Sequence, residues 1–250
     1  MSSHDPPSSA VPDTSRRVEV DPGRLSGWID RFAGNHGELL VRAGDGGVVV
    51  LAAPDGAVAA VDPPWPCGPP VQAPSSPPGV ATGVTDAAAV LTCLAEDVQR
   101  ARTVGLLLVR RGGFAVGVAD GPDLVDGKVG RRHVQGRTKA GGWSQQRYAR
   151  RRDAQAREAF AAAADAAVRL LRPRVRDLDG LVTGGDRAAV SAVLADPRLR
   201  ALSDLPQGRF LAVPDPRRRV LEDAVRRSRA VAIDVFDPLR DPSRPPIREP

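Results

Sequence analysis

The sequence predicts an α/β protein in which a mixed sheet is flanked by helices and a small N-terminal lobe combines a helix with strands. Two observations support this prediction. From residue 85 to residue 236, segments with helical spacing of apolar residues alternate with short, strongly apolar segments typical of strands. The chain has 250 residues, enough for one domain or for one domain with a small lobe. Only 4% of the residues are aromatic, so the core must consist mainly of Val, Leu and Ala.

The N-terminal lobe is expected over residues 19–62. Asp21 followed by Pro22 is typical of a helix start, and apolar residues from Leu25 to Phe32 follow at helical spacing, with Trp28 and Phe32 expected in the core. Three segments typical of strands come next, and these are residues 38–42, 47–52 and 57–61.

Compositional breaks delimit this lobe. Residues 1–18 and 241–250 are rich in Ser, Pro, Asp or Arg without apolar periodicity, which predicts disordered tails. Residues 63–80 are rich in proline and predict a loop, because proline interrupts helices and central strands. The main α/β domain is then expected over residues 81–240.

Within this domain, the Arg111-Gly112-Gly113 turn predicts a hairpin between residues 104–110 and 114–119. A long Ala- and Arg-rich helix is expected from about Ser144 to Leu171, where Pro173 stops it. The other expected helices are 85–100, 186–194 and 216–228, and the other expected strands are 123–129, 178–183, 210–213 and 231–236.

Several classes of protein are excluded. No apolar run approaches the ~20 residues of a membrane span, and the N-terminus lacks the apolar run of a signal peptide. The two cysteines and three histidines share no metal-ligand spacing. We therefore expect a monomeric cytoplasmic protein without membrane association, metal or cofactor.

Known catalytic motifs are also missing. Gly184-Gly185-Asp186 lies between a strand and a helix, a context that suits anion binding, but the GxxxxGK[ST] pattern is absent. A tight turn with Asp186 as the helix cap is the favoured interpretation. The sequence has no GxSxG, HExxH or Cys/His nucleophile pair.

The charge is concentrated in one segment. The net charge is +6, and residues 127–152 contain nine basic residues and no Asp or Glu. Such a segment is typical of a polyanion site, most often one for nucleic acid, although a solvated surface is the alternative. The nine residues are Lys128, Arg131, Arg132, Arg137, Lys139, Arg147, Arg150, Arg151 and Arg152.

A loop rich in special residues lies within this segment. Gly141-Gly142 gives backbone freedom, and Trp143 beside it can stack on a base or pack against its own domain. Ser144 can cap the following helix, and Gln145 and Gln146 fall in its first turn, where a neutral amide can donate and accept hydrogen bonds.

Three arginines follow at helical spacing. Arg147, Arg150 and Arg151 are separated by three and four residues, so they fall on one helical face. A stripe of this kind suits phosphate contacts along RNA.

These residues resemble the catalytic domain of the eukaryotic and archaeal peptide-chain release factors. That domain carries a mobile Gly-Gly-Gln loop in front of a basic helix. The sequence is more similar to the Vms-like release factors (the VLRF group), whose loop is GxxQ, which Gly142-Trp143-Ser144-Gln145 matches. RTKAGGWSQQRYARRRD resembles the actinobacterial-type branch, a peptidyl-tRNA hydrolase, and the resemblance covers about residues 20–240.

The resemblance implies a ribosome-dependent peptidyl-tRNA hydrolase. Its partners would be the rRNA of the large ribosomal subunit and peptidyl-tRNA. Gln145, on the mobile Gly141-Gly142 loop, would place a water against the ester carbonyl. Because two separating residues replace the direct Gly-Gly-Gln sequence, Gln146 is the alternative amide. The remaining residues would bind RNA, and they are Lys128, Arg131, Arg132, Arg137, Lys139, Trp143, Arg147, Arg150 and Arg151.

Two other functions compete with this one. A non-catalytic ribosome- or tRNA-binding factor could use the same basic loop but would not need the glutamine. A nuclease that holds a metal through carboxylates such as Asp126 and Asp153 is the weaker alternative, because nothing in their spacing favours it.

Overall fold

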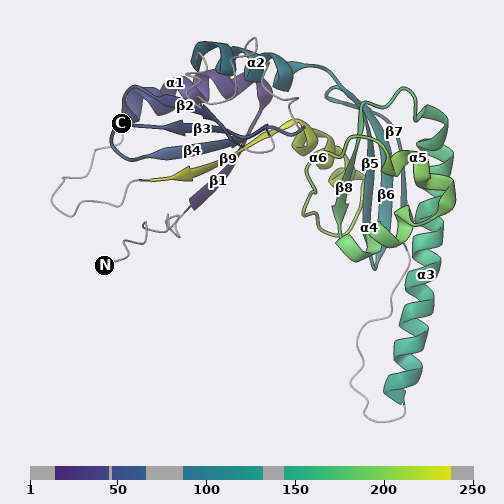
Figure 1. Ribbon diagram of the computed structural model, residues 1–250. Helices are drawn as coiled ribbons and strands as arrows, with labels where there is room; N and C mark the ends of the chain where they lie inside the picture. The colour runs from purple at the N-terminus through teal and green to yellow at the C-terminus, as the bar shows by residue number, and fades with distance from the viewer. Residues whose placement is uncertain (1–14, 45–46, 66–86, 132–143, 238–250) are drawn as a thin grey trace, which may run out of the picture. The chain divides into compact units, whose positions relative to one another are not determined.

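The computed structural model describes residues 15–44, 47–65, 87–131 and 144–237, and for Ser15, Arg131 and residues 144–156 it describes the backbone alone. These residues form two compact units (Figure 1). The first holds the described residues up to Pro63, those from Ala87 to Asp97 and those from Val231 onward, and the second holds Pro64, Trp65 and Val98–Ala230. None of the helices in the described ranges combines the length and the apolar character that a membrane span needs.

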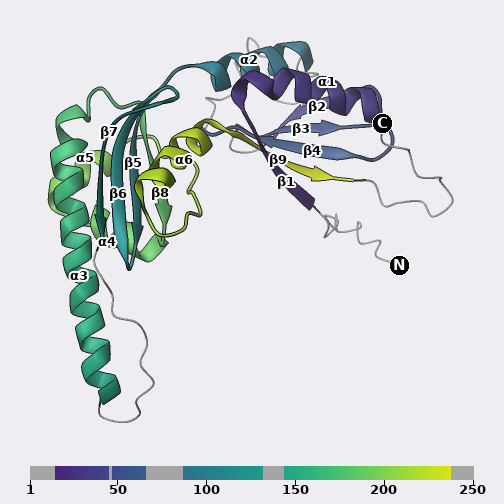
Figure 2. The same cartoon turned by 180° about the vertical axis from the view of Figure 1, so that it is seen from behind.

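The first unit is built on a five-stranded antiparallel sheet with strand order β1-β9-β4-β3-β2 (Figure 2). Alternate residues of β3 and β4 are buried, as expected of strands that cover a core with one face. Helix α1 and most of helix α2 belong to this unit. The bounds are β1 (Ser15–Val20), α1 (Leu25–His36), β2 (Leu40–Ala43), β3 (Val49–Ala52), β4 (Val58–Asp62), α2 (Ala87–Gln99) and β9 (Val231–Phe236).

The start of α1 follows the expected local chemistry. The carboxylate of Asp21 accepts a hydrogen bond from the Gly23 amide at 2.9 Å and caps a short turn that leads into the helix. Further along the helix Phe32 is buried, and the ring of half-buried Trp28 stacks on it with centroids 5.3 Å apart. The predicted helix and the core position of Phe32 are confirmed.

Strand β1 corrects the expected N-terminal tail. Residues 15–18, placed in that tail by their neighbours' composition, form a strand in which Val18 pairs with Ile233 of β9. Arg17 donates hydrogen bonds to Asp234 at 2.9 Å and to Asp62 at 3.3 Å, so side chains from neighbouring strands hold the edge as well. The alternation of Val18 and Val20 with charged residues is the strand signal, but it is too short to stand out beside residues 1–14.

The second unit contains a four-stranded mixed sheet with strand order β7-β6-β5-β8. The β5–β6 and β6–β7 pairs are antiparallel, and β5 and β8 are parallel. The hairpin predicted from Arg111-Gly112-Gly113 is therefore confirmed, as is the α/β class with a mixed sheet. The bounds of the strands are β5 (Thr103–Arg110), β6 (Gly113–Asp120), β7 (Asp123–Arg131) and β8 (Gly180–Gly185).

Helices cover both faces of this sheet (Figure 1). Leu107 and Val109 of β5 pack in a core with the buried residues of α3 and α4, whereas Leu106 and Leu108 face a second core that includes residues of α6. Strand β5 is accordingly buried on both faces. The bounds of the helices are α3 (Ser144–Leu170), α4 (Arg187–Leu194), α5 (Arg200–Ser203) and α6 (Arg218–Arg229).

A strand-like segment lies outside β8. The Leu211 amide donates to the Thr183 carbonyl and the Gly185 amide donates to the Leu211 carbonyl, at 2.9 and 3.0 Å. The strand expected over residues 210–213 is reduced to this single parallel bridge. These bonds nonetheless satisfy the backbone groups on the outer edge of β8.

Residues 63–80 were predicted to form a plain loop, but Trp65 within them is part of a hydrophobic core. Its side chain is 5% exposed in the second unit and packs in the core with α6. A Cβ atom at Gly180 would overlap the indole ring, and one at Gly208 would lie 3.0 Å from it. The two glycines therefore leave the space that the ring fills.

The division of the chain also differs from the expected linear one. Residues 87–97 and strand β9 were expected in the 81–240 domain, but they belong to the first unit. The reason is long-range pairing, because β9 lies between β1 and β4. An apolar strand such as VAIDVF shows that it is buried, but its sequence does not select a partner strand.

Replacing Trp65 with alanine should test its core role. We expect Trp65→Ala to lower the free energy of unfolding of the second unit by about 3–5 kcal/mol, because it leaves a cavity in a packed core. Denaturant unfolding followed by circular dichroism measures this. Trp28→Ala, at a half-buried position of the first unit, is the control and should cost less. A loss below about 1 kcal/mol for Trp65→Ala would mean that the ring is not part of the core.

Candidate functional site

The predicted basic segment runs from β7 through residues 132–143 into α3. Lys128 lies on β7, and Arg131 ends that strand opposite Gly113 of β6. Arg132, Arg137, Lys139, Gly141, Gly142 and Trp143 lie outside the described residues. The backbone places Gln145, Gln146, Arg147, Arg150 and Arg151 in the first turns of α3, which begins at Ser144. The predicted helix start is thereby confirmed.

Helix α3 has two different halves. It contains 27 residues, which corresponds to a length of about 40 Å. Among its described side chains, Ala159 is the first that is buried, and the alanines beyond it pack against the sheet. The first part of α3 extends past the end of the sheet in both views (Figures 1 and 2). Gln145 therefore lies about 20 Å from Ala159 along the helix axis.

The arginine stripe of α3 has a defined side. At about 100° per residue, the positions of Arg147, Arg150 and Arg151 centre on the side of the helix opposite Ala159 and Ala163. The buried alanines fix which side of the helix faces the sheet. The three arginine positions therefore lie on the side of α3 that faces away from the core.

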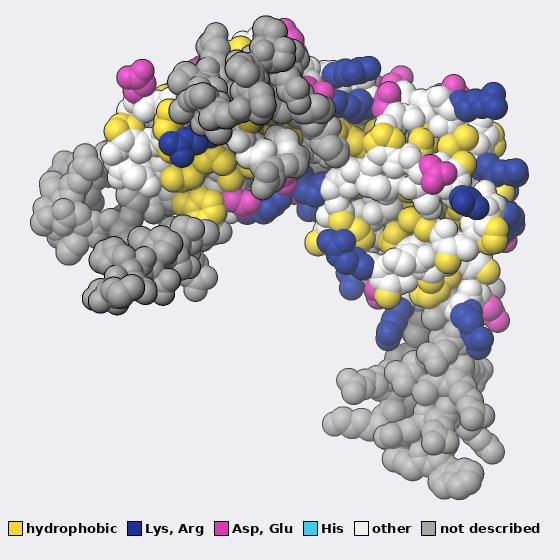
Figure 3. Space-filling view, in the orientation of Figure 1, with side chains coloured by type: hydrophobic (Ala, Val, Ile, Leu, Met, Phe, Trp, Pro, Cys, Tyr) yellow, Lys and Arg dark blue, Asp and Glu magenta, His cyan; other side chains and the backbone are white. Residues whose placement is uncertain are grey.

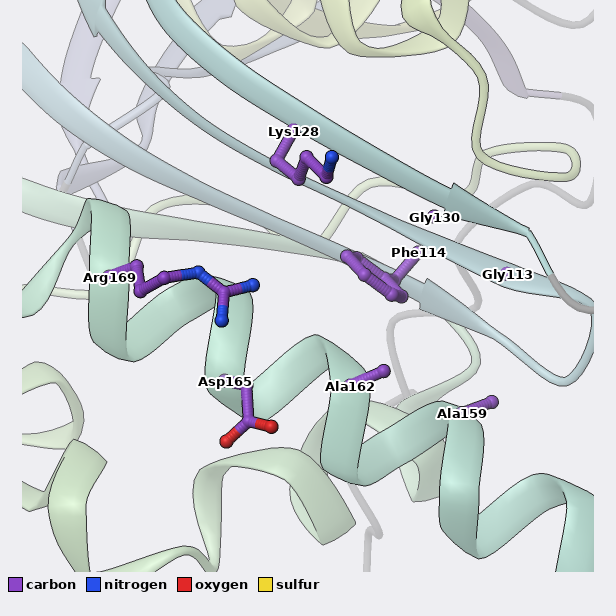
Figure 4. A pocket seen from close by; sticks show the side chains of 8 residues that line it. All are labelled: Gly113, Phe114, Lys128, Gly130, Ala159, Ala162, Asp165 and Arg169. Atoms are coloured by element: carbon purple, nitrogen blue, oxygen red, sulfur yellow. The ribbon is translucent and has the colours of Figure 1, made fainter.

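A pocket of about 280 Å³ lies where this helix meets the sheet (Figure 4). The Phe114 ring lies between the strands and α3, and Ala159 and Ala162 point toward it from the helix. Lys128 extends from β7 and Arg169 from α3. The pocket thus has an apolar floor and cationic groups on two elements. Its lining is Gly113, Phe114, Lys128, Gly130, Ala159, Ala162, Asp165 and Arg169.

Asp165, the acidic residue of the pocket, belongs to an ion-pair network. Asp165 points away from Phe114 (Figure 4) and accepts a hydrogen bond from Arg198 at 2.9 Å. Arg198 also binds Asp196 at 2.6 Å, and hydrogen bonds from its side chain and backbone hold the pKa of Asp196 at about 2, below the ordinary 3.8. Both carboxylates raise the pKa of Arg198. The network thus combines two carboxylates with one guanidinium, so Asp165 still offsets part of the positive charge of Lys128 and Arg169.

The pocket supplies binding groups, and its one carboxylate, Asp165, is paired with Arg198. The pocket holds cations and an aromatic ring but no His, Cys or Ser. No group of three or more His, Cys, Asp or Glu in the described ranges is placed to hold a metal. Asp126, one carboxylate of the nuclease alternative, pairs with Arg174 at 3.1 Å, and the side chain of Asp153 is not described.

The Gly184-Gly185-Asp186 turn has a structural role. The Asp186 carboxylate accepts hydrogen bonds from the amides of Ala188 and Ala189 at 2.9 and 3.3 Å, which caps α4. Gly185 has φ +102°, and a Cβ there would overlap the Val109 carbonyl. The favoured interpretation, a tight turn with a helix cap, is confirmed.

Sequence reasoning missed most of the pocket. Phe114 and Arg169 lie 55 residues apart, and no local pattern links them. The pairing of Phe114 with Gly130 is the one available signal, because a Cβ at Gly130 would overlap the Phe114 ring. This signal becomes visible only when the register between β6 and β7 is known.

This geometry defines a class of protein, an α/β unit with a long basic helix that leads away from its sheet. Residues 102–234, more than half of the chain, match the family model described as the Actinobacteria/chloroflexi VLRF1 release factor. The chain belongs to this family of release factors. The chain matches none of the curated proteins with which it was compared.

Two solved structures show limited similarity. The archaeal translation termination factor aRF1 is 18% identical with a TM-score of 0.36, and the match covers 85% of this chain and 63% of that one. A structure described as an archaeal protein is 19% identical with a TM-score of 0.32, covering 80% and 51%. The chain thus spans less than two thirds of the length of either. The family assignment rests on the family model alone.

The contact between Gly130 and Phe114 gives one test of the pocket. We expect Gly130→Ala to lower the free energy of unfolding by about 1–3 kcal/mol, because the added methyl group must displace the buried ring. Gly112→Ala is the matched control, because a Cβ there meets no atom within 4 Å. Denaturant unfolding compares the two, and equal stabilities would contradict the described packing.

The Arg198 network gives a second test. We expect Arg198→Gln to raise the pKa of Asp196 from about 2 toward 3.8, because the guanidinium hydrogen bond is lost. Since the folded-state pKa is depressed, this interaction stabilises the fold above about pH 3.8, and the stabilisation is lost as the pH falls through about 2. A carbon-13 NMR titration of the carboxyl group measures the change. An unchanged midpoint would show that Arg198 is not the cause.

Proposed function

We propose that this chain is a ribosome-dependent peptidyl-tRNA hydrolase that frees nascent peptides from stalled large ribosomal subunits. The match of residues 102–234 to a release-factor family carries the proposal, because this range includes the whole of Gly141–Arg151. The sequence keeps the GxxQ spacing from Gly142 to Gln145, and Gln145 is the second residue of α3. Catalysis would occur in the cytoplasm, with one protein chain and no metal or cofactor.

The proposed reaction is hydrolysis of the ester between the peptide and the terminal ribose of tRNA. The water oxygen bonds to the carbonyl carbon, and the bond from that carbon to the ribose oxygen breaks. The peptide leaves with a free carboxyl group, and a proton from the water goes to the ribose oxygen. The amide of Gln145 positions the water but, being neutral, does not act as a strong base.

The ribosome would supply what the chain lacks. The basic segment contains no Asp or Glu, so no carboxylate there can serve as a general base. Arg147, Arg150 and Arg151 would bind phosphates of rRNA or tRNA along α3, with Lys128 at the far end of the segment. Trp143 would stack on a base. Arg131, Arg132, Arg137 and Lys139 would hold the loop on RNA in the same way.

Helix α3 explains how such a loop could reach a deep site. Its alanine-rich half is held by the sheet, while Gln145 lies about 20 Å further along the helix axis. A helix transmits position more faithfully than a free loop of the same length. This arrangement suits a reaction centre enclosed by RNA.

Changing Gln145 tests the proposed catalysis. We expect Gln145→Ala to slow single-turnover peptide release from purified large subunits carrying peptidyl-tRNA by about 100-fold or more, because misplacement of the water is costly. Ribosome co-sedimentation should change by less than about twofold, since the arginines remain. Gln146→Ala is the neighbouring control.

The outcomes separate the alternatives. Loss of release in Gln146→Ala but not in Gln145→Ala would assign the role to Gln146. If wild type and both variants co-sediment with ribosomes at low salt and none releases peptide, the chain is a non-catalytic binding factor.

A further inference from the structure

We infer that the carboxyl edge of the four-stranded sheet is a second RNA-binding surface, formed by arginines outside the basic segment 127–152. We call this surface the arginine edge. The choice of RNA as its partner rests on the proposed function, whereas the surface itself is argued from the structure. It is defined by Arg110, Arg111, Arg187, Arg217 and Arg219.

The topology brings these residues together from distant parts of the chain. Strands β5 and β8 are parallel, and Val109 pairs with Gly185 near their ends. Arg110 and Arg111 therefore follow one strand end, and Arg187 follows the neighbouring one. Strand β7 ends at the same edge, because Arg131 and Arg110 both pair with Gly113 of β6.

A fourth segment reaches the same edge. The chain around Leu211 runs parallel to β8, so its continuation leaves the sheet at the carboxyl end. Arg110 confirms this placement, since its guanidinium donates a hydrogen bond to the Val213 carbonyl at 2.7 Å. Helix α6 then begins at Arg218, which places Arg217 and Arg219 at its first turn.

The charges of this edge are largely uncompensated. All five arginines are exposed, and Arg111, Arg187, Arg217 and Arg219 form no ion pair within the described part of the chain. Arg110 lies 3.9 Å from Asp215, which is itself 72% exposed. The other nearby carboxylates are engaged, because Asp186 caps α4 and Glu222 pairs with Arg218.

The opposite edge of the sheet carries aspartates at its strand ends beside the arginines that precede β5 and β8. Thr103 pairs with Asp120, which in turn pairs with Asp123, and these residues end β6 and begin β7. Asp179 precedes β8 and accepts a hydrogen bond from the Thr103 amide at 2.8 Å. These aspartates offset neighbouring arginines such as Arg100 and Arg172, so this edge attracts a polyanion less strongly than the arginine edge does.

One of the two adjacent helices adds to the positive charge. Helix α6 begins after the segment that leaves this edge and has no acidic residue in its first turn, so its N-terminal partial positive charge adds to the field of the guanidinium groups. At the start of α4 the Asp186 carboxylate offsets the same effect. Figure 3 shows Lys and Arg side chains at the lower end of the second unit, where the turn between β5 and β6 lies in Figure 1, and others at its upper end.

RNA fits this surface better than a lipid membrane does. Peripheral membrane sites combine charge with exposed apolar anchors. In the described ranges the exposed large hydrophobic side chains are Leu40 and Val125, and neither lies at this edge. Arginines alone, spread over about 10 Å from the end of β5 to the segment outside β8, suit contacts to successive phosphates.

A triple substitution tests the inference. We expect Arg111→Gln, Arg187→Gln and Arg219→Gln together to lower the slope of log affinity against log salt by about 2–3 for a fluorescein-labelled duplex RNA, because about three phosphate contacts are lost. The affinity at low salt should fall about tenfold or more. Fluorescence anisotropy measures both quantities, and thermal unfolding checks that the triple variant is folded.

The control carries the same change in charge elsewhere. Arg100, Arg172 and Arg176 lie near the opposite edge, are exposed and form no ion pair within the described residues. Their combined change to Gln should leave the slope within about 0.5 of wild type. The inference would be overturned if both triple variants lost the same amount of salt-dependence slope, or if the triple variant of the arginine edge lost none. Binding of the wild type to anionic phospholipid vesicles but not to RNA would also overturn it.

The test is independent of peptide release. If wild type releases no peptide but the edge triple loses RNA affinity, the proposed hydrolase fails and the arginine edge stands. If Gln145→Ala loses release while the edge triple binds RNA like wild type, the hydrolase stands and the arginine edge fails.

Discussion

Alanine packing between α3 and the four-stranded sheet sets the position of everything on the basic side of the second unit. Ala163, Ala166 and Ala167 are buried against a core that includes Phe114, Val116 and Val118 of β6. Small side chains let the helix backbone approach the strands closely, and they have no rotamers to order. The contact therefore fixes the axis of α3, and the axis fixes where its arginine positions and Gln145 lie.

The local elements could be predicted from the sequence because their signals are local. The hairpin of β5 and β6, the cap at Asp186 and the start of α3 at Ser144 each depend on a few neighbouring residues. Strand β9 was also recognised, but its partners were not, because β-pairing across the chain leaves no mark in a single segment. The burial of Trp65 was missed for the same reason.

The candidate site divides in the same way. Lys128 and the α3 arginines were recognisable as a concentrated charge within one segment. Phe114 and Arg169, which join Lys128 in the pocket, required the strand register and the helix packing. The arginine edge was the least predictable part from sequence, because its members are spread between Arg110 and Arg219 and each looks like an ordinary surface residue.

The order in which the chain joins its two units has a consequence for biosynthesis. Most of the second unit, Val98–Ala230, is inserted between two parts of the first unit, residues up to Asp97 and residues from Val231 onward. The sheet of the first unit cannot pair β1 with β4 through β9 until Val231–Phe236 has been made. During synthesis β2, β3 and β4 can pair with one another as they are made, but β1 waits for β9, so the first unit is completed only after the second unit has been made.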